Sequence, residues 1–377
     1  MANPILPPAT IGILGGGQLG RMTALAARSL GYSVQVLDPS ADCAARPVVD
    51  RVVAAPFDSV EGAETLARTS SVVTLEIEHI ALPALQAAAT HAPLRPAASI
   101  LHMVQDRERQ KSWLASRGVP IAPYALVDST ERFTDAARAL GSALFVKACE
   151  GGYDGRSQLR TNATTDFAAA FEQLGRRRLV AEQALDLELE LSVLVARSPS
   201  GETCVYPPAV NHHEQQQLAW SSMPGDLPPH IVRDAQQLAL DIAHALSLEG
   251  ILAVEMFLLT DGRLLVNELA PRPHNSYHAS ELACPTSQFE QLVRAVCDLP
   301  LGAVEPARPA AIVNLFGELW AENRTPDLAA ALRVPGTRLF LYGKGGSRRG
   351  RKMGHIAALG NSAADALANA RRAAAAL

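Results

Sequence analysis

The first hundred residues alternate apolar strands with helical patterns, and this alternation constrains the fold more than any other feature. The segments TIGIL, SVQVLD and SVVTL are short apolar runs, and after the first run Leu19, Met22 and Ala26 recur at helical spacing. Parallel strands need such crossover helices, so the pattern predicts a doubly wound parallel sheet. The proline-rich stretch 91–99 marks a boundary, and we expect a first domain over residues 1–98.

The pattern changes after this boundary. Residues 178–210 contain alternating segments such as ELELSVLVAR, and a long amphipathic helix follows, so the middle region is expected to be α+β. A second proline-rich stretch, 299–311, precedes a short β-containing tail with an alanine-rich last helix. We therefore expect a middle domain over 99–300 and a small C-terminal domain over 301–377.

Composition excludes several classes of protein. An apolar content of 48% and a charged content of 19% are typical of a globular protein, and a net charge of −4 gives no reason to expect a nucleic-acid partner. The five cysteines form no C-x-x-C pair, which indicates free thiols in a reducing compartment. No apolar run reaches membrane length, and the N-terminus has no signal-peptide pattern. We expect a cytoplasmic protein without a membrane partner.

The segment ILAVEMFLLTDGRLLVNELA predicts a β-hairpin that carries two acids. Asp261-Gly262 is typical of a two-residue type I′ turn, which would place Glu255 directly opposite Glu268. Two carboxylates about 5 Å apart repel by roughly 3 kcal/mol at an effective dielectric near 20. Such an oxygen pair inside apolar strands predicts a hard cation, Mg²⁺. A solvated sheet edge, or a register one residue off, would explain the same residues without a metal.

A glycine-rich loop joins the first strand to the first helix. Gly15, Gly17 and Gly20 form G-x-G-x-x-G, and Asp38 ends the next strand. This is the dinucleotide-binding fingerprint, which would make the chain a nicotinamide-dependent dehydrogenase. A less specific interpretation is a helix N-terminus that is open to an anion such as phosphate.

A second glycine-rich loop, EGGYDGRSQ, covers residues 150–158. Its glycines permit movement, and Tyr153, Asp154 and Arg156 could close over a bound ligand and exclude water. Lys147, on the strand before the loop, would direct an ammonium to the same place. A surface hairpin loop is the alternative.

Two cationic segments follow the acids. Arg272 stands between two prolines, which fix the backbone on either side and would hold the guanidinium beside the predicted metal site. An ordinary surface turn is the alternative.

The segment YGKGGSRRGRKMGH has five cations in the nine residues 344–352. Its glycines would let several cations converge on one anion. A solvated loop, or a nucleic-acid-binding segment, is the alternative.

Together, a lysine on a strand, a glycine-rich loop and paired acids on a late hairpin resemble the ATP-grasp ligases. The segments GGGQLGRM, EGGYDGRSQ, VEMF with VNELAPRPHNS, and GRKMGH are similar to those of the biotin-independent purine ligases of that superfamily, most of all the 5-(carboxyamino)imidazole ribonucleotide synthetases. These segments extend from Gly15 to His355, nearly the whole chain. The resemblance implies an ATP-grasp fold with a Rossmann-like N-terminal domain and a small β-containing C-terminal domain.

The resemblance also implies roles for individual residues. Expected ATP contacts are Arg107, Lys147, Gly152, Tyr153, Asp154, Gly155, Arg156, Ser157, Gln158, Glu182, Gln183, Ala184, Leu185, Glu190, His213, Asn267 and Glu268. Expected Mg²⁺ ligands are Glu255 and Glu268. Expected ribonucleotide contacts are Gln18, Leu19, Glu76, Asn275, Lys344, Arg351 and Lys352. Expected catalytic residues are Tyr153, Asp154, Arg156, Arg272 and His274.

The implied reaction joins ATP, bicarbonate and 5-aminoimidazole ribonucleotide in purine biosynthesis. ATP would be a co-substrate, Mg²⁺ the cofactor with Mn²⁺ as a substitute, and the protein a homodimer. Alternatives are a sister ATP-grasp ligase such as the formate-using glycinamide ribonucleotide transformylase, the dehydrogenase, and a nucleic-acid-binding protein.

Overall fold

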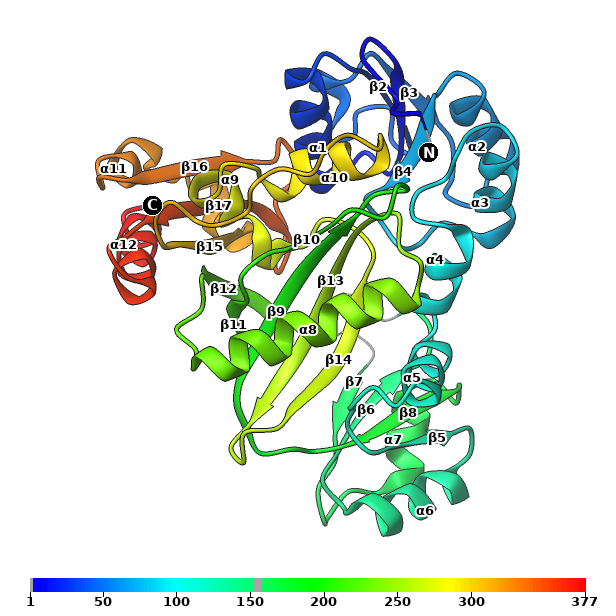
Figure 1. Ribbon diagram of the computed structural model, residues 1–377. Helices are drawn as coiled ribbons and strands as arrows, with labels where there is room; N and C mark the ends of the chain where they lie inside the picture. The colour runs from blue at the N-terminus through cyan, green and yellow to red at the C-terminus, as the bar shows by residue number, and fades with distance from the viewer. Residues whose placement is uncertain (1–2, 152–157) are drawn as a thin grey trace.

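The structure is a computed structural model that describes residues 3–151 and 158–377 (Figure 1). Its first part is the expected parallel sheet, with strands in the order β3-β2-β1-β4. The elements are β1 (Thr10–Leu14), α1 (Gln18–Ser29), β2 (Ser33–Asp38), η1 (Arg46–Val48), β3 (Arg51–Ala54), α2 (Val60–Ala67), β4 (Val72–Leu75) and α3 (Leu82–Ala89). Because β1 is central and the crossovers run to both of its sides, α1 lies on one face and α2 with α3 on the other (Figure 1).

The second part is a four-stranded antiparallel sheet in the order β5-β8-β6-β7. Helices α4 (Ala98–Val104) and α5 (Arg107–Ser116) lead into it. Its elements are β5 (Tyr124–Val127), α6 (Thr130–Leu140), β6 (Leu144–Ala148), β7 (Gln158–Arg160), α7 (Phe167–Gln173) and β8 (Leu179–Gln183). Helices α6 and α7 supply Phe133 and Phe171 to a separate apolar core with the sheet.

The third part is a nine-stranded antiparallel sheet, β14-β13-β9-β11-β12-β15-β17-β16, with β10 paired to β9. Its strands are β9 (Leu187–Arg197), β10 (Thr203–Val205), β11 (Ala209–Glu214), β12 (Gln217–Met223), β13 (Gly250–Leu259), β14 (Leu264–Ala270), β15 (Ala310–Phe316), β16 (Thr337–Leu341) and β17 (Lys352–Leu359). Its helices are α8 (Pro229–Ala245), η2 (Asn275–Tyr277), α9 (Ser280–Ala283), α10 (Gln288–Val296), η3 (Gly317–Asn323), α11 (Leu328–Leu332) and α12 (Ala363–Ala375). Because Trp220 of β12 pairs with Val313 of β15, the small C-terminal part extends the sheet of the middle part.

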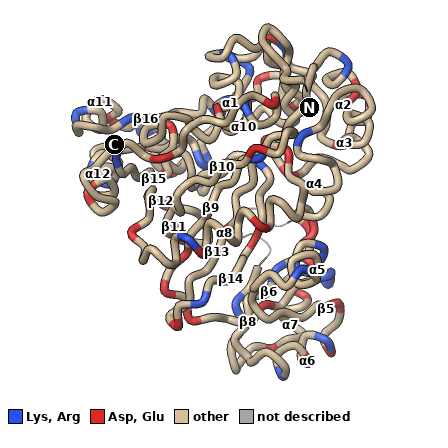
Figure 2. Tube along the Cα trace, in the orientation of Figure 1, with Lys and Arg blue, Asp and Glu red and all other residues tan. Residues whose placement is uncertain are grey.

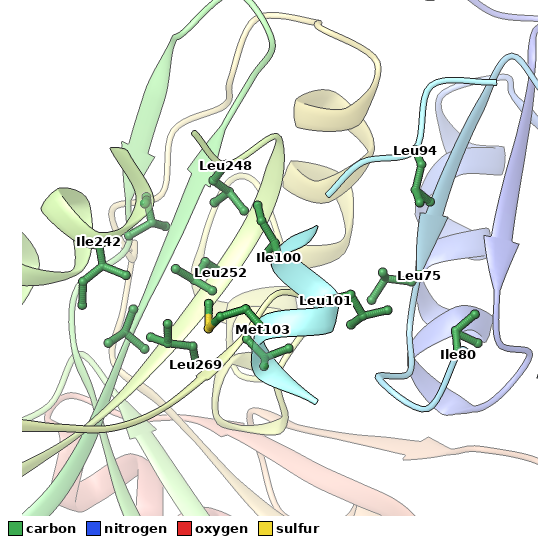
Figure 3. Close-up of a cluster of buried hydrophobic side chains, with 14 of the residues drawn as sticks. Leu75, Ile80, Leu94, Ile100, Leu101, Met103, Ile242, Leu248, Leu252 and Leu269 are labelled. Carbon is green, nitrogen blue, oxygen red and sulfur yellow. The ribbon is translucent and has the colours of Figure 1, made fainter. Parts of the chain in front are cut away.

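A continuous apolar core fixes the first part against the large sheet. Helix α4 supplies Ile100, Leu101 and Met103, which lie between Leu75 of the first part and Leu252 of β13 (Figure 3). All five side chains are buried, and burying each contributes about 1.5–3 kcal/mol. The relative placement of the two parts is therefore set by packing.

Charges are mixed along the chain. Figure 2 shows Lys and Arg interspersed with Asp and Glu in each part of the trace. The cationic segment 344–352 lies between β16 and β17, at the side of the large sheet. Among the helices of the described residues, none has the length and apolar character needed to cross a membrane.

Candidate active site

A cavity of about 480 Å³ lies where the small antiparallel sheet meets the large sheet. Strands β6, β8, β9, β13 and β14 contribute to its wall. The predicted residues on the wall are Arg107, Lys147, Gln158, Glu182, Gln183, Leu185, Glu190, His213, Glu255, Asn267, Glu268, Arg272 and His274. Ala184 is not among the lining residues. Gly152, Tyr153, Asp154, Gly155, Arg156 and Ser157 lie outside the described residues.

The acid pair lies across β13 and β14 as predicted, with Glu255 directly opposite Glu268. Burial raises the pKa of Glu268, and the charge of Glu255 raises it further. Burial acts against ionisation of Glu255 as well, but His274, His213 and Arg272 together lower its pKa. The His274 Nε2 atom lies 2.9 Å from Glu255 Oε1. Neighbouring cations thus favour the ionised form of Glu255, whereas the pKa of Glu268 stays raised although Arg107 and Lys147 act against the shift.

The predicted turn of this hairpin is wrong. The loop has three residues, 260–262, because Leu259 N donates to Arg263 O at 2.9 Å and Gly262 has a φ of 86°. Near the turn the strands therefore pair one step away from the predicted register. A β-bulge at Asn267 restores the register before the acids. The longer turn and the bulge cancel each other, so the acids face each other. The sequence revealed neither feature.

The Glu182 carboxylate lies between two lysines. Lys147 Nζ is 3.1 Å from Oε1, and Lys111 Nζ is 3.1 Å from Oε2. Burial opposes ionisation of Glu182, but Lys147 and Lys111 outweigh it and lower its pKa to about 2. Lys111 was not predicted as a site residue, because a lysine on a short polar helix resembles a surface residue, whereas this one is buried. The expected contact of Glu182 with ATP stays a prediction.

Arg272 points toward the first part of the molecule. Its Nε lies 3.0 Å from Glu78 Oε1, and its NH1 donates to Pro273 O at 3.0 Å. Gln105 holds the loop of Glu78 by donating to the carbonyls of Glu78 and Ile80 at 2.7 and 2.6 Å. Glu78 was not predicted as a site residue, because a contact with Arg272 across 194 positions leaves no local pattern in the sequence. The two prolines and this ion pair restrict the guanidinium.

The other end of the cavity combines polar and apolar walls. His213 Nδ1 lies 2.7 Å from Glu190 Oε2. Burial lowers the pKa of His213, but Glu190 raises it more, so the net direction is upward. The apolar lining residues of the cavity are Val104, Ala122, Phe145, Leu185, Leu187, Leu218, Phe257 and Leu269. An apolar slot beside a few polar groups is typical of a site for a flat aromatic base.

Predicted ribonucleotide contacts from three parts of the chain meet beside the cavity. Lys344 Nζ donates to Gln18 Oε1 at 2.6 Å, and Gln18 Nε2 donates to Asn275 Oδ1 at 2.9 Å. Asn275 and Lys352 also line the cavity. Arg351 donates to two carbonyls of its own loop. The structure therefore brings Gln18, Asn275 and Lys344 together at one end of the site.

The backbone donors of the first glycine-rich loop are already used within the fold. Glu76 accepts hydrogen bonds from the backbone N–H groups of Gly17, Leu19 and Gly20 at 2.9, 3.1 and 3.0 Å. Asp38 accepts a further N–H of the loop at 3.0 Å. The expectation of a helix N-terminus open to phosphate is wrong, because an internal carboxylate takes its donors. A dinucleotide would need the same donors, so this geometry disfavours the dehydrogenase.

Comparisons with known proteins agree with this arrangement. Three family descriptions match the chain: a ribonucleotide synthetase preATP-grasp domain over residues 8–105, an ATP-grasp domain over 112–289, and a phosphoribosylaminoimidazole carboxylase C-terminal domain over 310–369. An N5-carboxyaminoimidazole ribonucleotide synthase of Bacillus subtilis (strain 168) is 41% identical over 355 residues, which cover 93% of this chain and 92% of the relative.

Solved structures match over the full length. The ADP complex of an N5-carboxyaminoimidazole ribonucleotide synthetase has a TM-score of 0.94 at 40% identity, and the match covers 99% of this chain and 98% of that one. The Aspergillus clavatus N5-carboxyaminoimidazole synthase, in complex with ADP and 5-aminoimidazole ribonucleotide, has a TM-score of 0.88 at 30% identity and 98% coverage of both chains. The chain therefore belongs to the N5-carboxyaminoimidazole ribonucleotide synthase family of ATP-grasp ligases.

Proposed function

We propose that the chain uses ATP and bicarbonate to carboxylate the exocyclic amine of 5-aminoimidazole ribonucleotide in purine biosynthesis. The products are ADP, phosphate and 5-(carboxyamino)imidazole ribonucleotide. The observation that carries the proposal is one cavity whose wall holds the acid pair, Lys147, Arg272 and Asn275, the last bonded to Gln18 beside Lys344. Groups suited to a metal–phosphate complex and to a ribonucleotide thus share one site.

The donor set fits Mg²⁺. Glu255 and Glu268 are opposed, buried oxygen donors, and burial together with the charge of Glu255 raises the pKa of Glu268. Glu255 and Glu268, with the Asn267 side chain beside them, would hold Mg²⁺, which Mn²⁺ could replace. A bound ion would neutralise the charge that accumulates between phosphates during transfer.

Residues of the chain bind and orient the reacting phosphate and bicarbonate groups. Bicarbonate oxygen attacks the terminal phosphorus of ATP, ADP leaves, and carboxyphosphate forms. Lys147 and Arg107 bind phosphate oxygens, while the planar guanidinium of Arg272 binds the oxyanions of bicarbonate and carboxyphosphate. Because Glu78 and two prolines restrict Arg272, little ordering is needed on binding.

Carboxyphosphate must be kept from water until it releases CO₂ to the amine. The predicted roles of Tyr153, Asp154 and Arg156 in closing the site stay predictions, because these residues lie outside the described residues. His274 contacts Glu255 and would lie beside the reacting groups. Released phosphate is a suitable base for the amine proton.

The ribonucleotide end and the assembly are part of the same proposal. Gln18, Leu19, Glu76 and Asn275 would contact the imidazole ribonucleotide, and its phosphate would bind to Lys344, Arg351 and Lys352. We also propose domain limits at 1–98, 99–300 and 301–377, a homodimer and a cytoplasmic location, the last supported by five free cysteines.

One assay tests the function. ADP release should be slow with ATP alone and should rise strongly when bicarbonate and 5-aminoimidazole ribonucleotide are both present. Stimulation by formate with glycinamide ribonucleotide instead would indicate the sister ligase. Equal ADP release with and without the ribonucleotide would contradict the proposal.

A further inference from the structure

A buried group of four side chains lies behind the phosphate end of the cavity. Lys111 Nζ lies 3.1 Å from Glu182 Oε2 and donates to the Asn267 carbonyl at 3.2 Å. Lys147 Nζ lies 3.1 Å from Glu182 Oε1 and 3.5 Å from Asn267 Oδ1. Lys147, Glu182 and Asn267 line the cavity, whereas Lys111 does not. Lys111 therefore acts on a ligand only through its neighbours.

The charges of this group do not cancel. Two ammonium groups share one carboxylate, so the group carries a net charge of one positive unit. With Lys147 as its only cation, Glu182 would neutralise that ammonium and hold it in place, because a buried carboxylate without a partner is strongly destabilising. Lys111 gives Glu182 a second cation that no ligand can reach. Burial lowers the pKa of Lys111, and the attraction of Glu182 offsets only part of that effect. The test must therefore distinguish the charge of Lys111 from its hydrogen bonds.

Lys111 also contacts the backbone that sets the metal site. The carbonyl it binds belongs to Asn267, the bulged residue that brings Glu268 opposite Glu255. A bulge leaves backbone groups outside the ladder, and Lys111 satisfies one of them. A neutral donor could do the same, which allows the two roles to be distinguished by substitution.

We propose that Lys111 is a positioning residue, the permanent counter-ion of Glu182, and that it leaves Lys147 able to bind the phosphates of a nucleoside polyphosphate. The inference rests on the proposed nucleotide site. Under this proposal, Lys111 determines how strongly the phosphates are bound and has no effect on recognition of the base.

The test compares ADP with adenosine, which lacks the phosphates. Binding of both is measured by calorimetry for the parent, Lys111→Met, Lys111→Gln, Glu182→Gln and the double variant Lys111→Met/Glu182→Gln. Lys111→Gln keeps a donor for the Asn267 carbonyl but removes the charge. Dividing the ADP affinity by the adenosine affinity removes any effect of Glu182 on the base.

The expected ADP-to-adenosine ratio follows the net charge of the group. Lys111→Met and Lys111→Gln should each lower the ratio about tenfold or more, the double variant should return it close to the parent value, and Glu182→Gln should raise it. An unchanged ratio in both Lys111 variants, or a double variant no better than Lys111→Met, would overturn the inference. If Lys111→Met does not fold, Lys111→Gln gives the same comparison. A parent protein that binds no ADP would contradict the nucleotide site itself.

Discussion

Glu76 and Glu268 are both buried carboxyls, and burial raises the pKa of each. Their surroundings differ. Glu76 accepts three backbone N–H groups at the N-terminus of α1, where the helix carries a partial positive charge. Glu268 faces a second acid across a hairpin. The first carboxylate is satisfied within the fold, whereas the second needs a cation that the chain does not supply in full.

The comparison shows how a carboxyl group whose hydrogen bonds the fold supplies differs from one that faces a second acid. The glycine-rich loop around Glu76 has the sequence of a ligand site, but its donors are used internally. The hairpin around Glu268 looks like an ordinary sheet element, yet it places two carboxyl groups directly opposite each other. An unbalanced buried charge is therefore a better indication of a ligand than a motif.

The largest effect is expected for Glu268→Gln. Loss of the second carboxylate should lower turnover by roughly a hundredfold to a thousandfold, a size typical of removing one group that stabilises transition-state charge. Stability without ligand should be unchanged or higher, because the repulsion with Glu255 is gone. Turnover over a Mg²⁺ titration and denaturant unfolding measure the two effects.

Glu249→Gln is the matched control. Glu249 pairs with Arg95 away from the cavity, and its side chain is 40% exposed. This variant should keep full turnover. Normal activity of Glu268→Gln at ordinary Mg²⁺ would show that the acid pair does not hold the metal.

A different outcome is expected for Glu76→Gln, because the Glu76 side chain accepts the hydrogen bonds that hold the glycine-rich loop. The amide keeps one oxygen but turns an NH₂ group toward backbone donors, so the free energy of unfolding should fall by about 1–3 kcal/mol. ATP affinity should stay close to the parent value. Denaturant unfolding and ADP calorimetry check both statements, and a variant as stable as the parent would mean that the loop does not depend on this carboxylate.

A smaller effect is expected at the cationic segment. Arg351→Ala should raise the KM for 5-aminoimidazole ribonucleotide about tenfold and leave the KM for ATP nearly unchanged, because the guanidinium would bind only the ribonucleotide phosphate. Arg349→Ala, in an exposed position of the same segment, is the control. Equal losses for the ribonucleotide and its dephosphorylated nucleoside would show that Arg351 does not bind that phosphate.

Much of the architecture could be predicted from local patterns. Strand and helix periodicity indicated the parallel sheet. The predicted pairing of Glu255 with Glu268 is correct only because the longer turn and the bulge at Asn267 cancel each other. Contacts between distant segments could not be predicted. The partners of Glu78 and Lys111 lie far along the chain, and the Asn267 bulge depends on packing. The role of Glu76 as an internal cap was missed for the same reason, because its three donors lie more than fifty residues away.

The smallest expected effect is a change in how folding stability depends on pH, and it distinguishes Glu76 from Glu268 most directly. Both have a folded-state pKa above the ordinary value of 4.5, so the folded protein holds protons that the unfolded chain releases. Each therefore contributes stability that is present below pH 4.5 and is lost as pH rises through the folded pKa. As the pH rises above 4.5, the parent should lose stability relative to Glu268→Gln and relative to Glu76→Gln. Saturating Mg²⁺ and ADP should abolish the Glu268 difference, because the cation stabilises that carboxylate, and should leave the Glu76 difference in place. Unfolding midpoints at several pH values measure both slopes, and a Glu268 slope that persists with Mg²⁺ and ADP would place the ion elsewhere.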